Sequence, residues 1–304
     1  MLETIQRESV ISFPMLGNLR LNPPSYFTLF GHPIYFYGVL IGLGFLLGIA
    51  FCSRRAGRFG LRDDDIYDVM IWVIPCSIIG ARAYYVLFQL DYYLQHPDEF
   101  FAIRNGGLAI YGGVIAGVLV AYLVCRRKKI PFPAMLDCLC YGLLVGQIIG
   151  RWGNFLNREA FGAETAVFCR MGLTDLNGVT VYVHPTFLYE SLWNLGVLLF
   201  LLWFDKAGKR RFDGHCMSLY FLLYGLGRFW IEGLRTDSLY LGGTGIRISQ
   251  ALSLVLVLAA AALLIYKRSQ PFSPGDLYVN RVAAQKAAVI MENTQKEESE
   301  NGGL

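Results

Sequence analysis

Long hydrophobic segments recur along the whole chain and alternate with shorter polar connections. Seven of them are long enough, or nearly so, to cross a hydrocarbon core of about 30 Å, which takes about 20 residues of helix. They cover residues 34–52, 69–90, 108–125, 134–150, 186–204, 216–232 and 248–266. The pattern predicts an all-α integral membrane protein with seven transmembrane helices.

The composition supports this class and excludes several others. Of 304 residues, 55% are hydrophobic and 16% are charged, whereas a soluble domain has about 25% charged residues. Soluble, disordered, collagen-like and disulfide-rich secreted proteins are therefore excluded. The net charge of +4 does not indicate a nucleic-acid partner, and the seven cysteines contain no CxxC pair. We expect no metal site and no cofactor.

The basic residues predict the orientation. Lys and Arg cluster after the first, third, fifth and seventh segments, at residues 54–62, 126–129, 206–211 and 267–268. The positive-inside rule then places the N-terminus outside and the C-terminus in the cytoplasm. We expect an extracytoplasmic segment over 1–33, the seven-helix domain over 34–267, and a partly disordered cytoplasmic tail over 268–304, with a short helix near 282–291.

Polar residues concentrate at the predicted outer ends of the helices, and ionisable groups inside lipid by default mark a functional interior. On the sixth segment, Tyr224, Arg228, Glu232 and Arg235 have the spacing of one helical stripe. Together with Arg151, the two arginines of this stripe can converge on one anion. The guanidinium fork suits phosphate, and a phosphate at headgroup depth indicates a phospholipid.

The charged residues also have structural interpretations. Arg228 and Glu232 have the i, i+4 spacing of an intrahelical ion pair. Arg82 is equally compatible with an ion pair to Glu190 or Asp137 that locks helices together.

Other polar positions have alternatives as well. Tyr37 and Tyr111 have the predicted depth of interface aromatics, and His184 with Pro185 suits the start of a helix. The segment 150–159 (GRWGNFLNRE) is richer in polar residues than capping requires.

This segment resembles the signature of bacterial prolipoprotein diacylglyceryl transferases, a G-R-x-G-N-F-x-N-x-E pattern. Further matches occur in the order of the chain. They are Tyr37-Gly38, Gly80-Ala-Arg82, Gly106-Gly107, Gly112-Gly113, Asp137, HPTFLYE at 184–190 and GRFWIEGLR at 227–235. The resemblance extends over about residues 33–266.

The resemblance implies a multi-pass enzyme of the bacterial inner membrane that acts in lipoprotein biosynthesis. Such an enzyme transfers the diacylglyceryl group of phosphatidylglycerol to the lipobox cysteine of a preprolipoprotein, forming a thioether and releasing glycerol phosphate. It also implies site residues. Catalytic positions would be Arg151, Glu159, Arg228 and Tyr111, and substrate-binding positions Tyr37, Asn154, Asn157, Glu232, Arg235 and His184.

One position departs from part of the family. Some members carry a histidine, proposed as the base, where this chain has Tyr111. A phenol with an ordinary pKa of about 10 is a poor base near neutrality. The base is then Glu159 or His184, or the thiol needs only a pKa lowered by the arginines.

Two other functional classes compete. A transporter or channel would place polar residues at several depths, whereas the first, third and seventh segments carry no charge. A seven-helix receptor has no use for the three arginines. A lipid-binding relative without transferase activity is the remaining alternative.

Overall fold

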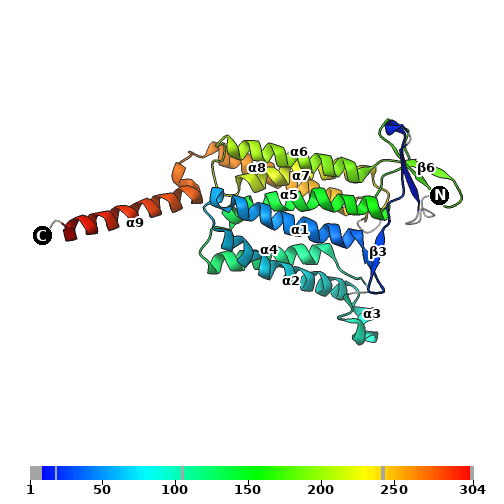
Figure 1. Ribbon diagram of the computed structural model, residues 1–304, viewed down its shortest axis with the longest axis horizontal. Helices are drawn as coiled ribbons and strands as arrows, with labels where there is room; N and C mark the ends of the chain where they lie inside the picture. Colours follow the sequence, from blue (N-terminus) through cyan, green and yellow to red (C-terminus); the bar gives the residue numbers. More distant parts are fainter. Residues whose placement is uncertain (1–8, 18, 104–105, 241–243, 302–304) are drawn as a thin grey trace. The chain divides into compact units, whose positions relative to one another are not determined.

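The computed structural model describes residues 9–17, 19–103, 106–240 and 244–301, most of which are helical (Figure 1). The helices are α1 (Phe36–Arg55), α2 (Asp63–Phe88), α3 (Leu90–Gln95), α4 (Ile110–Arg127), α5 (Phe132–Asn157), α6 (Thr186–Lys206), α7 (His215–Leu234), α8 (Ile248–Ser269) and α9 (Tyr278–Asn301). The strands are β1 (Val10–Phe13), β2 (Leu19–Leu21), β3 (Tyr26–Leu29), β4 (His32–Tyr35), β5 (Met171–Thr174) and β6 (Thr180–Val183).

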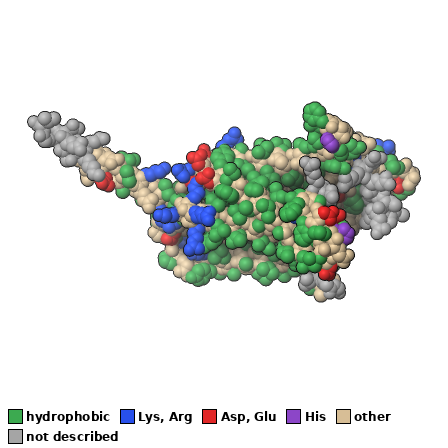
Figure 2. All heavy atoms as spheres, turned by 90° about the horizontal axis from the view of Figure 1, so that it is seen from below, with side chains coloured by type: hydrophobic (Ala, Val, Ile, Leu, Met, Phe, Trp, Pro, Cys, Tyr) green, Lys and Arg blue, Asp and Glu red, His purple; other side chains and the backbone are tan. Residues whose placement is uncertain are grey.

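Within this described part of the chain, six helices are long and apolar enough to cross a membrane: α1, α2, α4, α5, α6 and α8. Their surfaces carry exposed large apolar side chains, such as Leu46 on α1 and Ile265 on α8. Figure 2 shows a face of the molecule covered largely by hydrophobic side chains. The prediction of a mostly helical membrane protein is confirmed. The sixth predicted span, residues 216–232, forms the helix α7, but Arg228 and Glu232 lower its hydropathy and it is not among these six.

The chain divides into two compact units. Unit 1 comprises residues 1–50 and 139–272, and unit 2 comprises residues 51–138 and 273–304. In unit 1, α7 packs against both α6 and α8. A side chain at Gly227 of α7 would collide with the Trp193 indole of α6, whose Nε1 donates to the Leu223 carbonyl at 2.9 Å. This close approach brings the polar positions of α6 and α7 together.

The same unit contains a four-stranded antiparallel sheet with the order β2-β1-β5-β6. Its buried core joins strand residues such as Ile11 and Leu173 to Phe155 of α5 and Phe187 of α6. The sheet is therefore attached where α5 ends and α6 begins. The hydrophobic pattern predicts no strands in these segments, because each strand is only three or four residues long and gives little period-2 signal.

In unit 2, α2 and α4 pack through small residues. A Cβ at Gly80 of α2 would lie 2.4 Å from the Ala116 Cβ of α4, and one at Gly112 of α4 would lie 2.4 Å from the Gly80 carbonyl oxygen. Only glycine allows this spacing between the helices. At the C-terminal end of α4, Lys128 pairs with Asp65 at 2.8 Å and with Asp68.

The tail after α8 contains a longer helix than the sequence predicts. The expected short helix covers about 282–291, and α9 extends over Tyr278–Asn301. Its start contacts the turn before α2, where a Cβ at Gly60 would lie 2.8 Å from the Val279 Cα. The predicted domain boundaries and the partial disorder of the tail stay predictions.

Candidate functional site

Most of the signature, residues 150–157, lies on the last two turns of a helix. The sequence predicts an end of the fourth span at residue 150, with the signature in the connection after it, but α5 continues to Asn157. Arg151, Asn154 and Asn157 are therefore spaced three residues apart on one helix, close to one face. The chain leaves the helix through Arg158, whose φ of +51° ends the helical hydrogen-bond pattern.

An ion network connects α5, α6 and α7. The Arg151 Nη2 lies 2.6 Å from Glu190 Oε1, and the Arg228 Nη1 donates to Glu190 Oε2 at 3.0 Å. The other terminal nitrogen of Arg228 lies 2.6 Å from Glu232 Oε2. Both glutamates are 2% exposed, whereas the Arg151 and Arg228 side chains are 22% and 15% exposed. The arginines are therefore the part of the network that an incoming ligand can reach.

The network continues into the signature turn through amide groups. Arg151 Nη1 donates to Asn154 Oδ1 at 3.2 Å, and Asn154 Nδ2 donates to Glu159 Oε1 at 3.0 Å. Asn157 Nδ2 donates to the same oxygen at 3.2 Å. Glu159 itself is exposed, so these amides hold a solvent-accessible carboxylate beside Arg151.

The structure separates the interpretations that the sequence leaves open for the charged residues. Arg228 and Glu232 do form the intrahelical pair, but Arg228 also binds Glu190 of another helix. The pair is thus part of a larger network. Within the described residues, the charged partners of Glu190 are Arg151 and Arg228. The alternative pairing of Arg82 with Glu190 or Asp137 stays a prediction.

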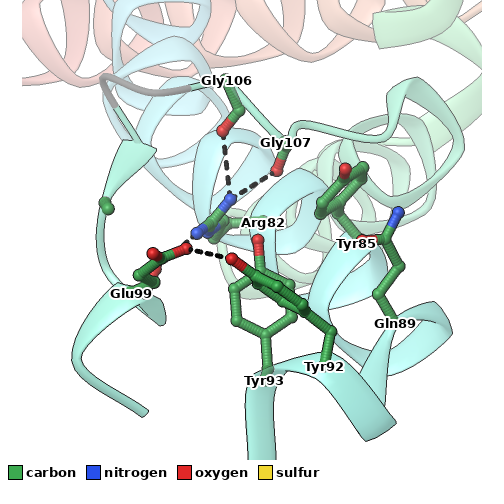
Figure 3. A pocket seen from close by; sticks show the side chains of 9 residues that line it. Arg82, Tyr85, Gln89, Tyr92, Tyr93, Glu99, Gly106 and Gly107 are labelled. Carbon is green, nitrogen blue, oxygen red and sulfur yellow. Dashed lines mark hydrogen bonds between the residues drawn. The ribbon is translucent and has the colours of Figure 1, made fainter. Parts of the chain in front are cut away.

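Arg82 holds a loop of unit 2. Its guanidinium donates to the carbonyl oxygens of Phe100 at 2.9 Å and Glu99 at 2.6 Å, and to those of Gly106 and Gly107 at 3.0 Å each. Arg82 lines a pocket of about 220 Å³ (Figure 3), and its guanidinium carbon lies 5.1 Å from the centre of the Tyr93 ring. The guanidinium donors are used by backbone carbonyls. Arg82 therefore anchors the loop that leads into α4.

Tyr111 lies on the first turn of α4, in unit 2, and is half-buried. The backbone around Tyr111 is held by the Arg82 loop before it and by the contact between Gly80 and Gly112 after it. The Ala109 N–H also donates to the Ala81 carbonyl at 3.0 Å. The start of α4 is thus held tightly against α2.

Arg235 does not continue the helical stripe of α7. The helix ends at Leu234, and Arg235 comes next in extended conformation with ψ of 150°. Its guanidinium binds both carboxylate oxygens of Asp237, at 2.9 and 2.7 Å. Burial opposes ionisation of Asp237, but the hydrogen bonds from Arg235 prevail and lower the pKa of that carboxyl. Asp237 is not a predicted site residue, because it has no motif of its own.

His184 lies before α6 beside the segment that comes after the signature. Its backbone exchanges hydrogen bonds with Gly162 and Ala163, and Ala163 N–H donates to the Leu234 carbonyl at 2.8 Å. This segment thus links the entry of α6 to the end of α7. The His184 Nδ1 lies 3.3 Å from the Tyr189 hydroxyl, and burial lowers the pKa of His184 below its usual value. His184 is therefore neutral near pH 7.

Tyr37 is the second residue of α1 and its ring lies against α5. A Cβ at Gly153 would lie 2.6 Å from Cδ2 of this ring, so the glycine beside Asn154 makes room for Tyr37. Tyr37 is 37% exposed. The structure thus places Tyr37 next to the signature turn.

Arg158 is not among the predicted site residues. It is 4% exposed and makes five hydrogen bonds to uncharged oxygens within the described residues. Four acceptors belong to the N-terminal segment before β3: the Ser9 and Pro23 carbonyls, the Asn22 side chain and the Ser25 hydroxyl. These hydrogen bonds hold the N-terminal segment against Arg158, the residue before Glu159. A single arginine in a loop carries no sequence signal of such a role.

The described residues contain no group of three or more His, Cys, Asp or Glu side chains arranged to hold a metal ion. The polar groups of the site are arginines, carboxylates and amides. Such a set binds an anion through charge-assisted hydrogen bonds.

A model of the family described as prolipoprotein diacylglyceryl transferase matches residues 24–266. The matched range contains the whole ion network. The chain belongs to this family. The resemblance seen in the sequence is therefore confirmed.

Relatives of the family are similar over most of their length. A protein of Finegoldia magna is 44% identical over 244 residues, which cover 80% of this chain and 95% of that protein. Proteins of Enterococcus faecalis and Clostridioides difficile are each 43% identical, covering 81% and 79% of this chain and 90% and 93% of theirs. All three are named phosphatidylglycerol--prolipoprotein diacylglyceryl transferase.

Proposed function

We propose that this protein transfers the diacylglyceryl group of phosphatidylglycerol to the lipobox cysteine thiol of preprolipoproteins. The bond between the diacylglycerol carbon and the phosphate oxygen breaks, and its electron pair stays on the phosphate. A carbon–sulfur bond forms, the thiol proton is lost and glycerol phosphate leaves. The proposal rests on family membership and on the site geometry.

The observation that carries the proposal is the convergence of Arg151 and Arg228. They come from α5 and α7, and both contact the same buried carboxylate, that of Glu190. Two guanidiniums held this way are prepared to bind a phosphodiester through bidentate hydrogen bonds. Negative charge increases on the leaving phosphate in the transition state, so fixed cations in a site of low polarity accelerate its departure.

The proposal assigns a role to each of the site residues. Arg151, Arg228, Glu159 and Tyr111 act on the reacting groups. The substrates are bound by Tyr37, Asn154, Asn157, Glu232, Arg235 and His184. The enzyme supplies no nucleophile of its own, since the thiol comes from the lipobox cysteine.

Two residues, Glu159 and His184, are candidates for the base that removes the thiol proton. Glu159 is exposed and receives hydrogen bonds from two asparagine side chains. His184 has a lowered pKa and is neutral near pH 7, the form that accepts a proton. The nearby arginines also favour the thiolate and reduce the demand on either base.

The membrane arrangement belongs to the same proposal. The six apolar helices and α7 together give seven spans in an inner-membrane protein, with the N-terminus outside and the C-terminus in the cytoplasm. The ends of α5 and α7 and the start of α6 then lie at the outer leaflet. Phosphatidylglycerol and the lipobox of a signal peptide both reach this level from within the membrane.

The function is tested with purified protein, phosphatidylglycerol labelled in its diacylglyceryl group, and a lipobox peptide. We expect label on the peptide and an equal amount of released glycerol phosphate. A peptide with Cys→Ser is the control and stays unlabelled. Bound but unchanged phosphatidylglycerol would instead favour a lipid-binding protein without transferase activity.

Replacing Tyr111 by phenylalanine removes only the hydroxyl. If that hydroxyl contacts substrate and is not the base, we expect turnover to fall less than about tenfold, the effect of losing one hydrogen bond. The same peptide assay measures this. A loss as large as that of Arg151→Ala would mean that the hydroxyl takes part in the chemical step.

A further inference from the structure

Glu190 occupies the centre of the ion network and is not among the predicted site residues. Each of its two oxygens contacts a different arginine: Oε1 lies 2.6 Å from Arg151 Nη2 and Oε2 lies 3.0 Å from Arg228 Nη1. Its side chain is 3% exposed. A carboxylate shared between two guanidiniums fixes the distance between them, because both are bound to the same rigid group.

The charges of the network explain why this position matters for an anion. Two arginines face two buried carboxylates, Glu190 and Glu232. The positive and negative charges of these four side chains are therefore equal in number before any lipid is bound. A phosphodiester brings one more negative charge, and Glu190 lies within hydrogen-bond distance of both cations that would bind it.

We propose that Glu190 is a positioning residue that sets the spacing of Arg151 and Arg228 and weakens their hold on phosphate. The inference rests on the proposed function, since the phosphate is that of the lipid and of the released glycerol phosphate. The first effect prepares the arginines for the transition state. The second lets the product leave, because a like charge beside a bound anion lowers its affinity.

A packing role alone predicts something different. A residue that only fills space between α6 and its neighbours would change stability and would leave anion affinity unaltered. A residue that competes electrostatically with phosphate changes anion affinity when its charge is removed. The substitution Glu190→Gln keeps the size and shape of the side chain, so it separates the two roles.

The experiment compares the intact wild-type protein with Glu190→Gln. Binding of glycerol phosphate is measured by titration calorimetry, which needs no catalytic activity, and kcat and KM for phosphatidylglycerol are measured in the peptide assay. We expect glycerol phosphate to bind about tenfold more tightly to Glu190→Gln, as for removal of one nearby like charge. We expect kcat to fall by about tenfold or more, and KM to fall as well.

Asp205→Asn is the matched control. Asp205 is a buried carboxylate on the same helix, 15 positions further along (205 − 190), and pairs with Arg210 at 3.0 Å. It tests the loss of a buried charge on α6 away from the site. We expect its affinity for glycerol phosphate to equal that of the wild type, whatever happens to its thermal stability.

The outcomes separate this inference from the proposed function. Equal or weaker glycerol phosphate binding by Glu190→Gln overturns the inference, even if the wild type transfers lipid normally. If Glu190→Gln binds glycerol phosphate more tightly but the wild-type protein transfers no lipid, the inference is supported for an anion site and the proposed reaction is overturned. No binding of glycerol phosphate to either protein overturns the inference and removes the phosphate site from the proposed function.

Discussion

Replacing Arg228 by alanine is expected to reduce diacylglyceryl transfer by about a thousandfold or more. Removing one preorganised donor from a transition-state site costs about 10²–10³ in rate, and Arg228 also orders its neighbours. Its guanidinium holds Glu190 at 3.0 Å and Glu232 at 2.6 Å. The substitution leaves two buried carboxylates with one fewer cation, so the remaining Arg151 is drawn more strongly to them and less to phosphate. Label on the lipobox peptide measures the loss.

Arg151→Ala is expected to behave in the same way, because Arg151 contacts the other oxygen of Glu190 and also Asn154. Arg228→Lys separates geometry from charge. It keeps the charge but loses the fork, so we expect activity between that of the wild type and of Arg228→Ala. Membrane insertion and the elution profile in detergent show whether each variant is folded. Turnover like that of the wild type in either alanine variant would refute the phosphate site.

The second large effect is expected on stability. Arg158→Ala removes one guanidinium that makes five hydrogen bonds with distances from 2.6 to 3.1 Å. Each buried acceptor left without a donor costs about 1–3 kcal/mol, although water entering the site replaces part of this. We expect the free energy of unfolding to fall by about 3–5 kcal/mol, the range for a broken buried polar network.

Thermal denaturation in detergent measures this effect, and Arg170→Ala is the control. Arg170 belongs to the same unit, but its hydrogen bonds to Ala166 and Val167 are exposed. Its guanidinium also lies 4.9 Å from the centre of the Tyr182 ring, so we expect its change to stay within about 1 kcal/mol. An unchanged melting temperature for Arg158→Ala would show that the N-terminal segment is held by its sheet pairing and not by the arginine.

The prediction from sequence was most successful for the helices. All seven hydrophobic segments lie within or overlap helices of the structure, because an apolar run of that length and a backbone in need of internal hydrogen bonds leave few other conformations in lipid. Helix ends were less accurate. Asp63–Asp65 add a first turn to α2 by favouring a helix N-terminus, and α5 extends through the polar signature to Asn157.

The spacing of residues along α5 and α7 also predicts, from the sequence alone, which side chains of one helix interact. Arg151 with Asn154, and Arg228 with Glu232, have the spacing of helical neighbours, and local geometry alone makes them interact. The end of α7 at Leu234 leaves no such signal in the sequence. Arg235 leaves the helix and pairs with Asp237, two residues ahead, a contact that depends on how the chain turns there.

Hydrophobic length and a contiguous ten-residue signature are local properties, so the sequence alone is enough to predict a helical membrane protein and its family. Which charges meet depends on the tertiary structure. Glu190 is 39 positions from Arg151 and 38 from Arg228 (190 − 151 and 228 − 190), so only the packing of α6 with its neighbours makes it their shared partner. Arg82 and Arg158 likewise bind loop carbonyls far along the chain, and a backbone carbonyl leaves no mark in a sequence.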